Sequence, residues 1–409
     1  MLPKLHKKYS KEQVVLGSIV NDYCELTNVI GEWRMKKLFT LLIAILLLVN
    51  CSKNEKNYTV KEIDGVKVFH NTTTPADPNF KITPKKLFTI SGDETDSISG
   101  KTHFKYPTHI DVDDDGNIYI LDNKLASIIK YDSSGKFIKK IGSKGQGPGE
   151  LDNPWLFSIF KGTIYVSEFP KCNHLFTTDG EFLQTDSIIK SVIEDINDST
   201  LLSENLINEA VEDKMFMTHT IGLMKDDFKD FKTLELNKFE DTGPDCNIMF
   251  NVIPYCVGND KIYIAKRSYD QYEIDEYNSH GVNTLKIRKS YARIPLNDKE
   301  LESYVRSRNT FDNAEKANFK QVYKQVIHKC GMHIDKNGNL LVEAPVKRTD
   351  KNEYDYIVDV FKDGVFINTI KLDIGKGFDY YHTEHRHFFK GNRIFYMNRE
   401  ENSVTVYEY

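Results

Sequence analysis

Three short patterns of acidic, glycine and histidine residues could do chemistry in this sequence. The first is the run DVDDDGNIYILD at 111–122, whose carboxylates are spaced like those of a calcium-binding EF-hand loop. An EF-hand has a helix on each side and a bidentate glutamate at its twelfth position. Here strand-like residues flank the run and Asp122 holds that position. The sequence therefore favours a tight acidic turn between two strands, with calcium binding as the alternative.

The glycine and histidine patterns can also be explained without a binding site. GSKGQGPG at 142–149 lacks the Lys-Ser/Thr ending of a phosphate loop and does not lead into a helix. It predicts a sharp connection between sheets, because glycines allow a tightly packed path. His382, His385 and His387 form H-x-x-H-x-H, and at strand spacing the last two point the same way. Metal binding is one interpretation, and partly exposed loop histidines are the favoured one.

Short strands in a repeated unit must position these residues. Residues 104–147 read as four strands separated by turns rich in Asp, Ser and Gly. Similar units begin near residues 153, 191, 250, 326 and 385, and the last has three strands. A four-stranded antiparallel meander cannot bury both of its faces alone. Recurring units that cover one another therefore predict a β-propeller.

The strand that completes the last unit lies far away in the sequence. KLFTISG at 86–92 resembles the fourth strand of the first unit, but no first three strands precede it. Pairing it with the C-terminal strands would close the ring and remove two free sheet edges. We therefore predict an all-β fold, a six-bladed β-propeller of four-stranded antiparallel blades over 85–409. Five and seven blades are the alternative counts.

Superposing the six units brings one residue of each first strand into a common position. These residues are Asp111, Phe157, Glu194, Tyr255, His333 and His387. We expect them on the innermost strands near the mouth of the central channel, where they could bind a ligand or a metal. A slip of one residue would turn a side chain to the other face of its strand. A water-filled channel lining is the alternative.

One segment departs from the strand pattern. Residues 297–328 are charged and rich in helix formers, and Asn297 or Asp298 could cap a helix. We expect a helical insertion between blades four and five. Long insertions on a propeller emerge at one face and often carry function, although a lid that only packs is the alternative.

The N-terminal region has the features of an export signal. The basic MKK at 35–37 precedes an apolar run at 38–49, which fits the h-region of a signal peptide and is short for a membrane span. The run ends in LVNC at 48–51. This resembles a bacterial lipobox, with Asn50 where Gly, Ala or Ser is usual. We predict a signal peptide at 35–50 and lipidation of Cys51, with an uncleaved signal anchor as the alternative.

The remaining N-terminal segments are interpreted around that signal. Residues 1–34 would be a gene-model extension, with Met35 as the true start. Residues 51–84 would form a polar tether and a small hairpin with a turn at Asp64–Gly65.

Composition and cysteine spacing narrow the possible functions only slightly. The net charge is −5, so nothing points to nucleic acid. Export would make a disulfide between Cys246 and Cys256 feasible, and thiols at these positions and at Cys172 and Cys330 are the alternative. The sequence has no C-x-x-C pair, so it shows no zinc signature of that type.

The first unit carries a family resemblance. Its runs IDVDDDGNIYILD, IIKYDSSGKF and IGSKGQGPGE resemble NHL-type repeats. Together with the leading EIDGV hairpin they are similar to six-bladed β-propeller lipoproteins of Bacteroidota-type bacteria, over about residues 58–409. The resemblance implies the fold and a location in the cell envelope. It would place the protein on a lipid anchor, by expectation at the outer membrane, periplasmic or exposed at the surface.

Two functions remain in competition. A binding or scaffold module for an envelope protein, a peptide or a glycan is favoured, because no nucleophile–base signature stands out and the aromatic content suits recognition. The competitor is a metal-dependent hydrolase or lyase, like the lactonase-type and streptogramin-lyase-type propellers, with a divalent metal in the channel. Its ligands or acid–base groups would be Asp111, Glu194, His333 and His387. At least three of these side chains would have to converge on one point.

Overall fold

The structure is a computed structural model. It describes residues 56–93, 103–168, 172–186, 191–225, 230–241, 251–298, 300–301, 323–343, 345–347, 349, 355–377 and 385–409. The predicted signal peptide, Cys51, Cys246 and His382 lie outside the described residues. So does most of the predicted helical insertion, and the described part contains no interpretable helix that would show it. No helix of the described residues is long and apolar enough to cross a membrane.

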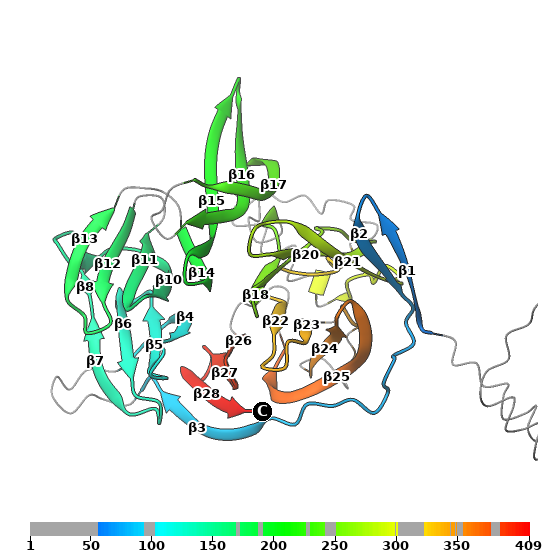
Figure 1. Cartoon of the computed structure of the whole chain (residues 1–409). Helices are drawn as coiled ribbons and strands as arrows, with labels where there is room; N and C mark the ends of the chain where they lie inside the picture. Colours follow the sequence, from blue (N-terminus) through cyan, green and yellow to red (C-terminus); the bar gives the residue numbers. More distant parts are fainter. Residues whose placement is uncertain are drawn as a thin grey trace, which may run out of the picture. The chain divides into compact units, whose positions relative to one another are not determined.

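Six four-stranded antiparallel sheets form the blades of a propeller, as predicted, and Figure 1 shows them around a common centre. Blade one has β4 (Pro107–Val112), β5 (Ile118–Asp122), β6 (Ser127–Tyr131) and β7 (Phe137–Ile141). Blade two has β10 (Pro154–Phe160), β11 (Thr163–Glu168), β12 (Cys172–Thr177) and β13 (Phe182–Asp186). Blade three has β14 (Ser191–Asn197), β15 (Thr200–Val211), β16 (Lys214–Lys225) and β17 (Lys232–Asp241).

The other half of the ring repeats this order. Blade four has β18 (Tyr255–Gly258), β19 (Lys261–Ala265), β20 (Tyr272–Asn278) and β21 (Asn283–Lys289). Blade five has β22 (Met332–Ile334), β23 (Leu340–Glu343), β24 (Asp355–Lys362) and β25 (Val365–Lys376). Blade six has β26 (His385–Lys390), β27 (Arg393–Asn398), β28 (Ser403–Glu408) and β3 (Lys85–Ser91). A short parallel pair, β8 (Ser143–Lys144) and β9 (Glu150–Leu151), connects blades one and two.

The N-terminal segment closes the ring, which confirms the predicted pairing. Strand β3 lies antiparallel to β28 and supplies the fourth strand of blade six. The predicted hairpin is also present, as β1 (Tyr58–Ile63) and β2 (Val66–Asn71). It adds to the outer edge of blade four, where β2 runs parallel to β21. The Asn71 side chain reaches blade five, donating to the Gly364 carbonyl at 2.9 Å and accepting from the Phe366 N–H at 2.8 Å.

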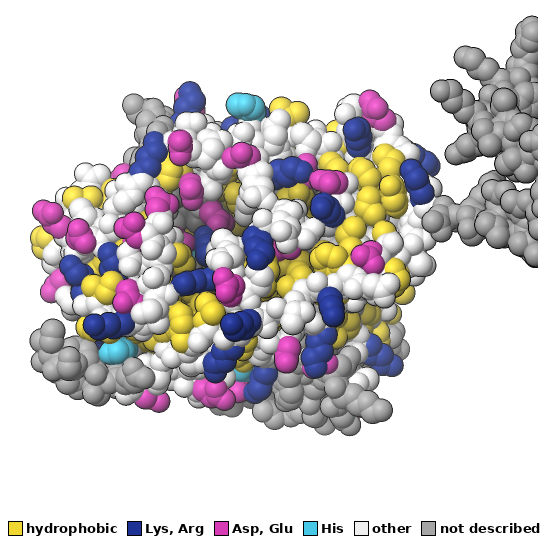
Figure 2. Space-filling model, turned by 60° about the horizontal axis from the view of Figure 1, so that its bottom comes forward, with side chains coloured by type: hydrophobic (Ala, Val, Ile, Leu, Met, Phe, Trp, Pro, Cys, Tyr) yellow, Lys and Arg dark blue, Asp and Glu magenta, His cyan; other side chains and the backbone are white. Residues whose placement is uncertain are grey.

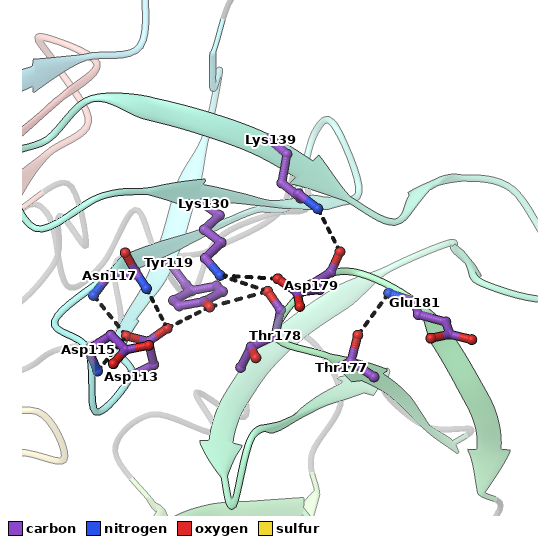
Figure 3. Close-up of polar contacts among 10 residues, drawn as sticks. All are labelled: Asp113, Asp115, Asn117, Tyr119, Lys130, Lys139, Thr177, Thr178, Asp179 and Glu181. Atoms are coloured by element: carbon purple, nitrogen blue, oxygen red, sulfur yellow. Dashed lines mark hydrogen bonds and ion pairs between the residues drawn. The ribbon is translucent and has the colours of Figure 1, made fainter.

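The acidic run at 111–122 forms a turn between two strands. In Figure 3 the Asp113 carboxylate faces Asp115, Asn117 and Tyr119. It accepts bonds from the Asp115 and Asn117 backbone N–H groups and from the Tyr119 hydroxyl, at 3.1, 2.8 and 2.8 Å. Asp113 therefore holds the turn together, and Gly116 at φ 79° supplies its left-handed position.

Neighbouring blades are joined by apolar packing and by a few polar contacts. One core cluster combines Tyr119 and Leu121 of blade one with Phe157 and Val166 of blade two. At its edge, the Lys130 ammonium donates to the Thr178 carbonyl at 3.0 Å (Figure 3). Burial between sheets thus fixes the angle between blades and, with it, the positions of the inner strands.

Two further predictions, the helical insertion and the disulfide, fall only partly within the described residues. Asn297 and Glu300 bond reciprocally, each side chain accepting the other's backbone N–H at 2.9 Å, which is the geometry of a capping box. Residues 302–322 beyond it are outside the described part. Cys256 is a buried thiol, and Cys246, its predicted partner, lies outside the described residues. Cys172 and Cys330 are thiols as well.

Candidate functional site

A cavity of about 510 Å³ lies along the inner strands of the propeller. Its walls come mainly from β4, β10, β14, β18, β22 and β26 and from the loops that precede them. Glu204 on β15, and Asn123 and Arg399 in the loops after β5 and β27, complete the lining. Aromatic and basic side chains dominate the lining: Tyr106, Trp155, Tyr255, Phe388, Phe389, Lys329, Arg386, Lys390 and Arg399. Elsewhere the two signs of charge are interspersed, as on the face in Figure 2. The cavity is a concave site with aromatic walls and a few charged groups, as small-ligand sites are.

The structure divides the six residues predicted to share a ring. All six lie on first strands, but only Glu194, Tyr255, His333 and His387 line the cavity. Phe157 is fully buried in the core between blades one and two. The Asp111 carboxylate accepts the Ile159 backbone N–H at 2.9 Å, which ties blade one to blade two.

Several first strands are irregular. Register shifts occur between Pro107 and His109 in β4, between Pro154 and Leu156 in β10, and twice in β14. Glu194 follows such a shift and still lines the cavity, so the shifts alone do not decide which residues reach it. The blades also differ in the connection between their first two strands: Val112 pairs with Ile118, whereas Phe160 pairs with Thr163. Superposition by sequence pattern assumes equal connections, which these blades do not have.

His387 touches the cavity but is held inside the blades. Its ring stacks on Tyr356 at 3.9 Å and on Tyr396 at 5.1 Å between ring centroids. Nε2 lies 3.3 Å from the Ile374 carbonyl. His385 points to the same side and also stacks on Tyr396. The two histidines of the H-x-H pair are thus buried packing residues of a strand, and not the partly exposed loop residues that we favoured.

Two more histidines lie among aromatic rings in the channel. The ring of His333 stacks on Phe389 with centroids 4.4 Å apart. His109, which the sequence pattern did not single out, lies edge-on between Phe157 and Phe388 at 5.4 and 5.2 Å. Burial lowers the pKa of His109 and of His333 to about 3, and that of His387 to about 4. All three imidazoles are therefore neutral at neutral pH.

A buried ionic cluster stands where the inner strands begin. Oε2 of Glu204, on β15, is 3.0 Å from the Lys329 ammonium, 3.2 Å from His219 Nε2 and 3.2 Å from the Tyr255 hydroxyl. His219 Nδ1 accepts the Ile253 backbone N–H at 3.1 Å, which places the imidazole proton on Nε2, facing Glu204. Burial raises the pKa of Glu204, but Lys329 and His219 outweigh it and lower the pKa to about 2.

This cluster escaped sequence reasoning because its members come from three blades. Glu204 and His219 lie on the second and third strands of blade three, whereas the superposition compared first strands only. Lys329 precedes the first strand of blade five. No local spacing links such residues, and only the closed ring brings them together.

A second ionic group lies where the inner strands end. The Lys390 ammonium is 3.2 Å from Asp111 and 2.6 Å from Glu194. Burial lowers the pKa of Lys390, but Asp111 and Glu194 outweigh it and raise the pKa. Two of the predicted residues are thus brought together, but around an ammonium group and not around a metal.

The four residues expected of a channel metalloenzyme do not converge. Within the described part of the chain, none of Asp111, Glu194, His333 and His387 belongs to a set of three metal-binding side chains whose ligand atoms lie within 4.8 Å of one another. Two are used by Lys390 and two are stacked on aromatic rings.

Arg386 stands apart from these balanced groups. It lines the cavity, and its Nη1 donates to the neutral carbonyl of Thr108 at 3.2 Å. Among the described residues it forms no ion pair, and its Nε is buried without a hydrogen-bond partner. The carboxylates of Glu194 and Glu204, in contrast, each face a lysine. The cavity therefore presents positive charge that the described residues do not neutralise.

One family model agrees with the architecture over part of the chain. A family model described as a 6-bladed β-propeller (DUF5128) matches residues 99–189, which covers blades one and two. No curated protein matches the sequence. Among solved structures, an exported protein from Bacteroides fragilis is similar at 13% identity and a TM-score of 0.45, covering 83% of this chain and 98% of that one. A DUF4221 protein from Bacteroides vulgatus is similar at 12% identity and a TM-score of 0.42, covering 80% and 97%. Virginiamycin B lyase from Staphylococcus aureus is similar at 13% identity and a TM-score of 0.35, covering 79% and 99%.

Proposed function

We propose that the protein is an envelope-anchored binding module whose channel cavity takes an acidic oligosaccharide. The observation that carries this proposal is the guanidinium of Arg386, which lines the cavity without an ion-pair partner among the described residues. A guanidinium can bind a carboxylate through two parallel hydrogen bonds. A bound uronate would supply the missing negative charge.

The aromatic lining supports a sugar as the ligand. Trp155 and Tyr255 line the cavity beside Lys329, whose ammonium lies 5.8 and 6.0 Å from their ring centroids. Aromatic rings offer flat apolar faces at low conformational cost, and a sugar ring has a matching apolar face. The volume of about 510 Å³ suits a short oligomer more than a folded partner.

Anchoring rests on the sequence of the N-terminal region. We propose that Cys51 is lipidated after removal of the signal peptide and holds the propeller at a membrane of the cell envelope, by expectation the outer membrane. Metabolic labelling with a fatty-acid analogue should mark the wild-type chain, and Cys51→Ala should abolish the label. A label that persists in Cys51→Ala would contradict this part of the proposal.

Titration calorimetry with oligogalacturonate tests the ligand class. We expect the full chain to bind it and to bind its methyl ester at least tenfold more weakly, because esterification removes the carboxylates. Arg386→Gln should weaken binding about 10–100-fold, the value of a hydrogen bond to a charged group. Arg393→Gln is the matched control, since Arg393 bonds to the Ser133 carbonyl and does not line the cavity.

Three outcomes would overturn the proposal. Equal affinity for the acid and its ester would remove the role of charge. Preference for acidic peptides over either sugar would replace the ligand class. Cleavage of the oligosaccharide during the titration would favour the competing hydrolase or lyase.

A further inference from the structure

The β11–β12 hairpin of blade two carries a carboxylate, a thiol and an imidazole on one face. Glu168 and Cys172 are directly opposite each other in the antiparallel pair. His174 follows Cys172 by two residues on β12, so the two side chains point to the same face. This group lies outside the channel, on the wall of a separate cavity of about 560 Å³.

The three side chains meet at distances that fit a metal ion. His174 Nε2 is 3.4 Å from Cys172 Sγ and 3.4 Å from Glu168 Oε2. All three ligand atoms lie within 4.8 Å of one another. In a tetrahedral zinc site the usual bond lengths separate sulfur from nitrogen, and nitrogen from oxygen, by about 3.4–3.6 Å. The group thus has the dimensions of three corners of a zinc tetrahedron.

Hydrogen bonds from outside the group orient Glu168 and His174. Glu168 Oε1 accepts the backbone N–H groups of Asp152 and Asn153 at 2.6 and 3.2 Å, so Oε2 is the oxygen turned toward the thiol and the imidazole. His174 Nδ1 lies 3.1 Å from the Thr185 hydroxyl, on the next strand. A metal-bound histidine characteristically donates its other N–H to an oxygen in this way.

The same geometry argues against a catalytic triad. In a thiol–imidazole–carboxylate triad the nucleophile and the carboxylate contact different ring nitrogens. Here Cys172 and Glu168 both face Nε2 of His174, while Nδ1 faces Thr185. Three donor atoms that converge on one point are the arrangement of metal ligands.

We propose that Glu168, Cys172 and His174 form a zinc site to which the described residues supply three ligands and no fourth. Cys172 binds as the thiolate, and its proton passes to solvent when the ion enters. Three protein ligands and an open position are typical of catalytic zinc, whereas structural zinc sites have four protein ligands. This site is separate from the channel and does not depend on the function proposed for it.

The glycine-rich loop forms the opposite wall of this cavity. Glu150 folds back over the loop, where its Oε2 accepts the Gly147 N–H at 2.8 Å. A side chain at Gly145 would collide with the Glu150 carboxylate, so the close approach requires glycine there. A water or a substrate on the ion would thus face a loop that carries a second carboxylate, Glu150.

Cobalt titration of the metal-free full chain tests the site. We expect a thiolate-to-cobalt charge-transfer band in the near-ultraviolet that saturates at one equivalent of Co²⁺ and disappears when Zn²⁺ is added. Cys172→Ser should abolish the band, and His174→Gln should weaken binding. Thr185→Val should weaken binding about 10–100-fold while leaving the band in place, as loss of an orienting hydrogen bond does.

Cys330→Ser is the matched control, because Cys330 is a half-exposed thiol of the channel cavity. The proposal is overturned if no band forms, or if Cys172→Ser binds cobalt with an unchanged band. If Cys172→Ser does not fold, the rate of alkylation of Cys172 in the wild type tests the site instead. One equivalent of Zn²⁺ must then slow modification of Cys172 at least tenfold, and an unchanged rate contradicts the site.

Discussion

The channel cavity and the blade-two pocket differ in the partners of their ionisable side chains. The blade-two pocket is the one that holds Glu168, Cys172 and His174. In the channel, Glu204 and Glu194 each face an ammonium, at 3.0 and 2.6 Å. In the blade-two pocket a carboxylate, a thiol and an imidazole converge on one another. Ion pairs from different blades complete each other and stabilise the ring. A convergent donor set on one hairpin has the arrangement of metal ligands.

This difference distinguishes side chains whose ion pairs stabilise the fold from side chains that could bind a ligand. The channel uses most of its charges internally, and Arg386 is the exception that could recognise an anion. The blade-two pocket has its donors oriented by backbone N–H groups and by Thr185, at little cost to the rest of the sheet. The following predictions act on one region and leave the other unchanged.

Acid should produce the largest change, and it should act through the channel. His109, His333 and His387 have pKa values lowered by burial to about 3, 3 and 4, against 6.5 in the unfolded chain. Their contribution to stability is fully present above pH 6.5 and is lost as pH falls toward 4, because the unfolded chain takes up protons first. Each proton contributes about 1.4 kcal/mol per pH unit, so the free energy of unfolding should fall by up to about 4 kcal/mol per unit.

Urea denaturation at several pH values between 6.5 and 4.5 measures this slope. His333→Phe should reduce it by about a third. His280→Gln, at an exposed position, is the matched control and should not change it. A slope that is the same in His333→Phe and the wild type would show that the channel histidines do not carry the acid sensitivity.

Loss of the lysine that neutralises Glu204 should come next. Lys329→Met leaves the Glu204 carboxylate buried without its ammonium, which should reduce the free energy of unfolding at pH 7 by about 3–5 kcal/mol. Lys144→Met, at an exposed position, is the control. Because the pKa of Glu204 is lowered to about 2, the effect should shrink as pH falls from 4.5 toward 2. An effect below 1 kcal/mol at pH 7 would mean that water replaces the lysine.

Zinc should stabilise the chain through blade two alone. At a free concentration of 100 times the dissociation constant, it should raise the free energy of unfolding by about 2.7 kcal/mol. Cys172→Ser should lose this gain, whereas Lys329→Met should keep it. A gain that Lys329→Met abolishes and Cys172→Ser retains would move the metal to the channel and reverse the comparison.

The Lys390 group should have the smallest effect, since Lys390 and Glu194 are partly exposed. Lys390→Met leaves Asp111 and Glu194 without their shared ammonium and should cost about 1–2 kcal/mol in the free energy of unfolding. Adding Glu194→Gln should recover part of the loss, as measured by a double-mutant cycle. Additive losses would show that the two residues do not interact.

The sequence predicted the ring better than the site, for physical reasons. Blades and closure follow from the period of two along strands and from turns marked by Asp and Gly, which are local signals. Even the distant strand near Leu87 could be assigned, because an incomplete unit at one end matched a single strand at the other. The ring of six residues failed at Asp111 and Phe157, because superposition assumes that every blade joins its first two strands in the same way, and blades one and two join them through connections of different length.

The Glu204 cluster and the Glu168–Cys172–His174 group differ in whether the sequence could have revealed them. Glu204, Lys329 and Tyr255 meet only in the closed ring, so no local pattern announces them. Cys172 and His174 form C-x-H on a predicted strand, with Glu168 on the strand before. The period of two places them on one face, so this pattern was readable. A C-x-x-C pair is only one zinc signature, and this site has C-x-H with a glutamate on the preceding strand.

Alkylation of cysteines, read by mass spectrometry, tests the separation of the two sites most directly. Cys330 reports on the channel cavity and Cys172 on the blade-two pocket, and both thiols are half-exposed. We predict that oligogalacturonate slows modification of Cys330 only, and that one equivalent of Zn²⁺ slows modification of Cys172 only. Protection of Cys330 by zinc, or unchanged modification of Cys330 with saturating oligosaccharide, would contradict the account.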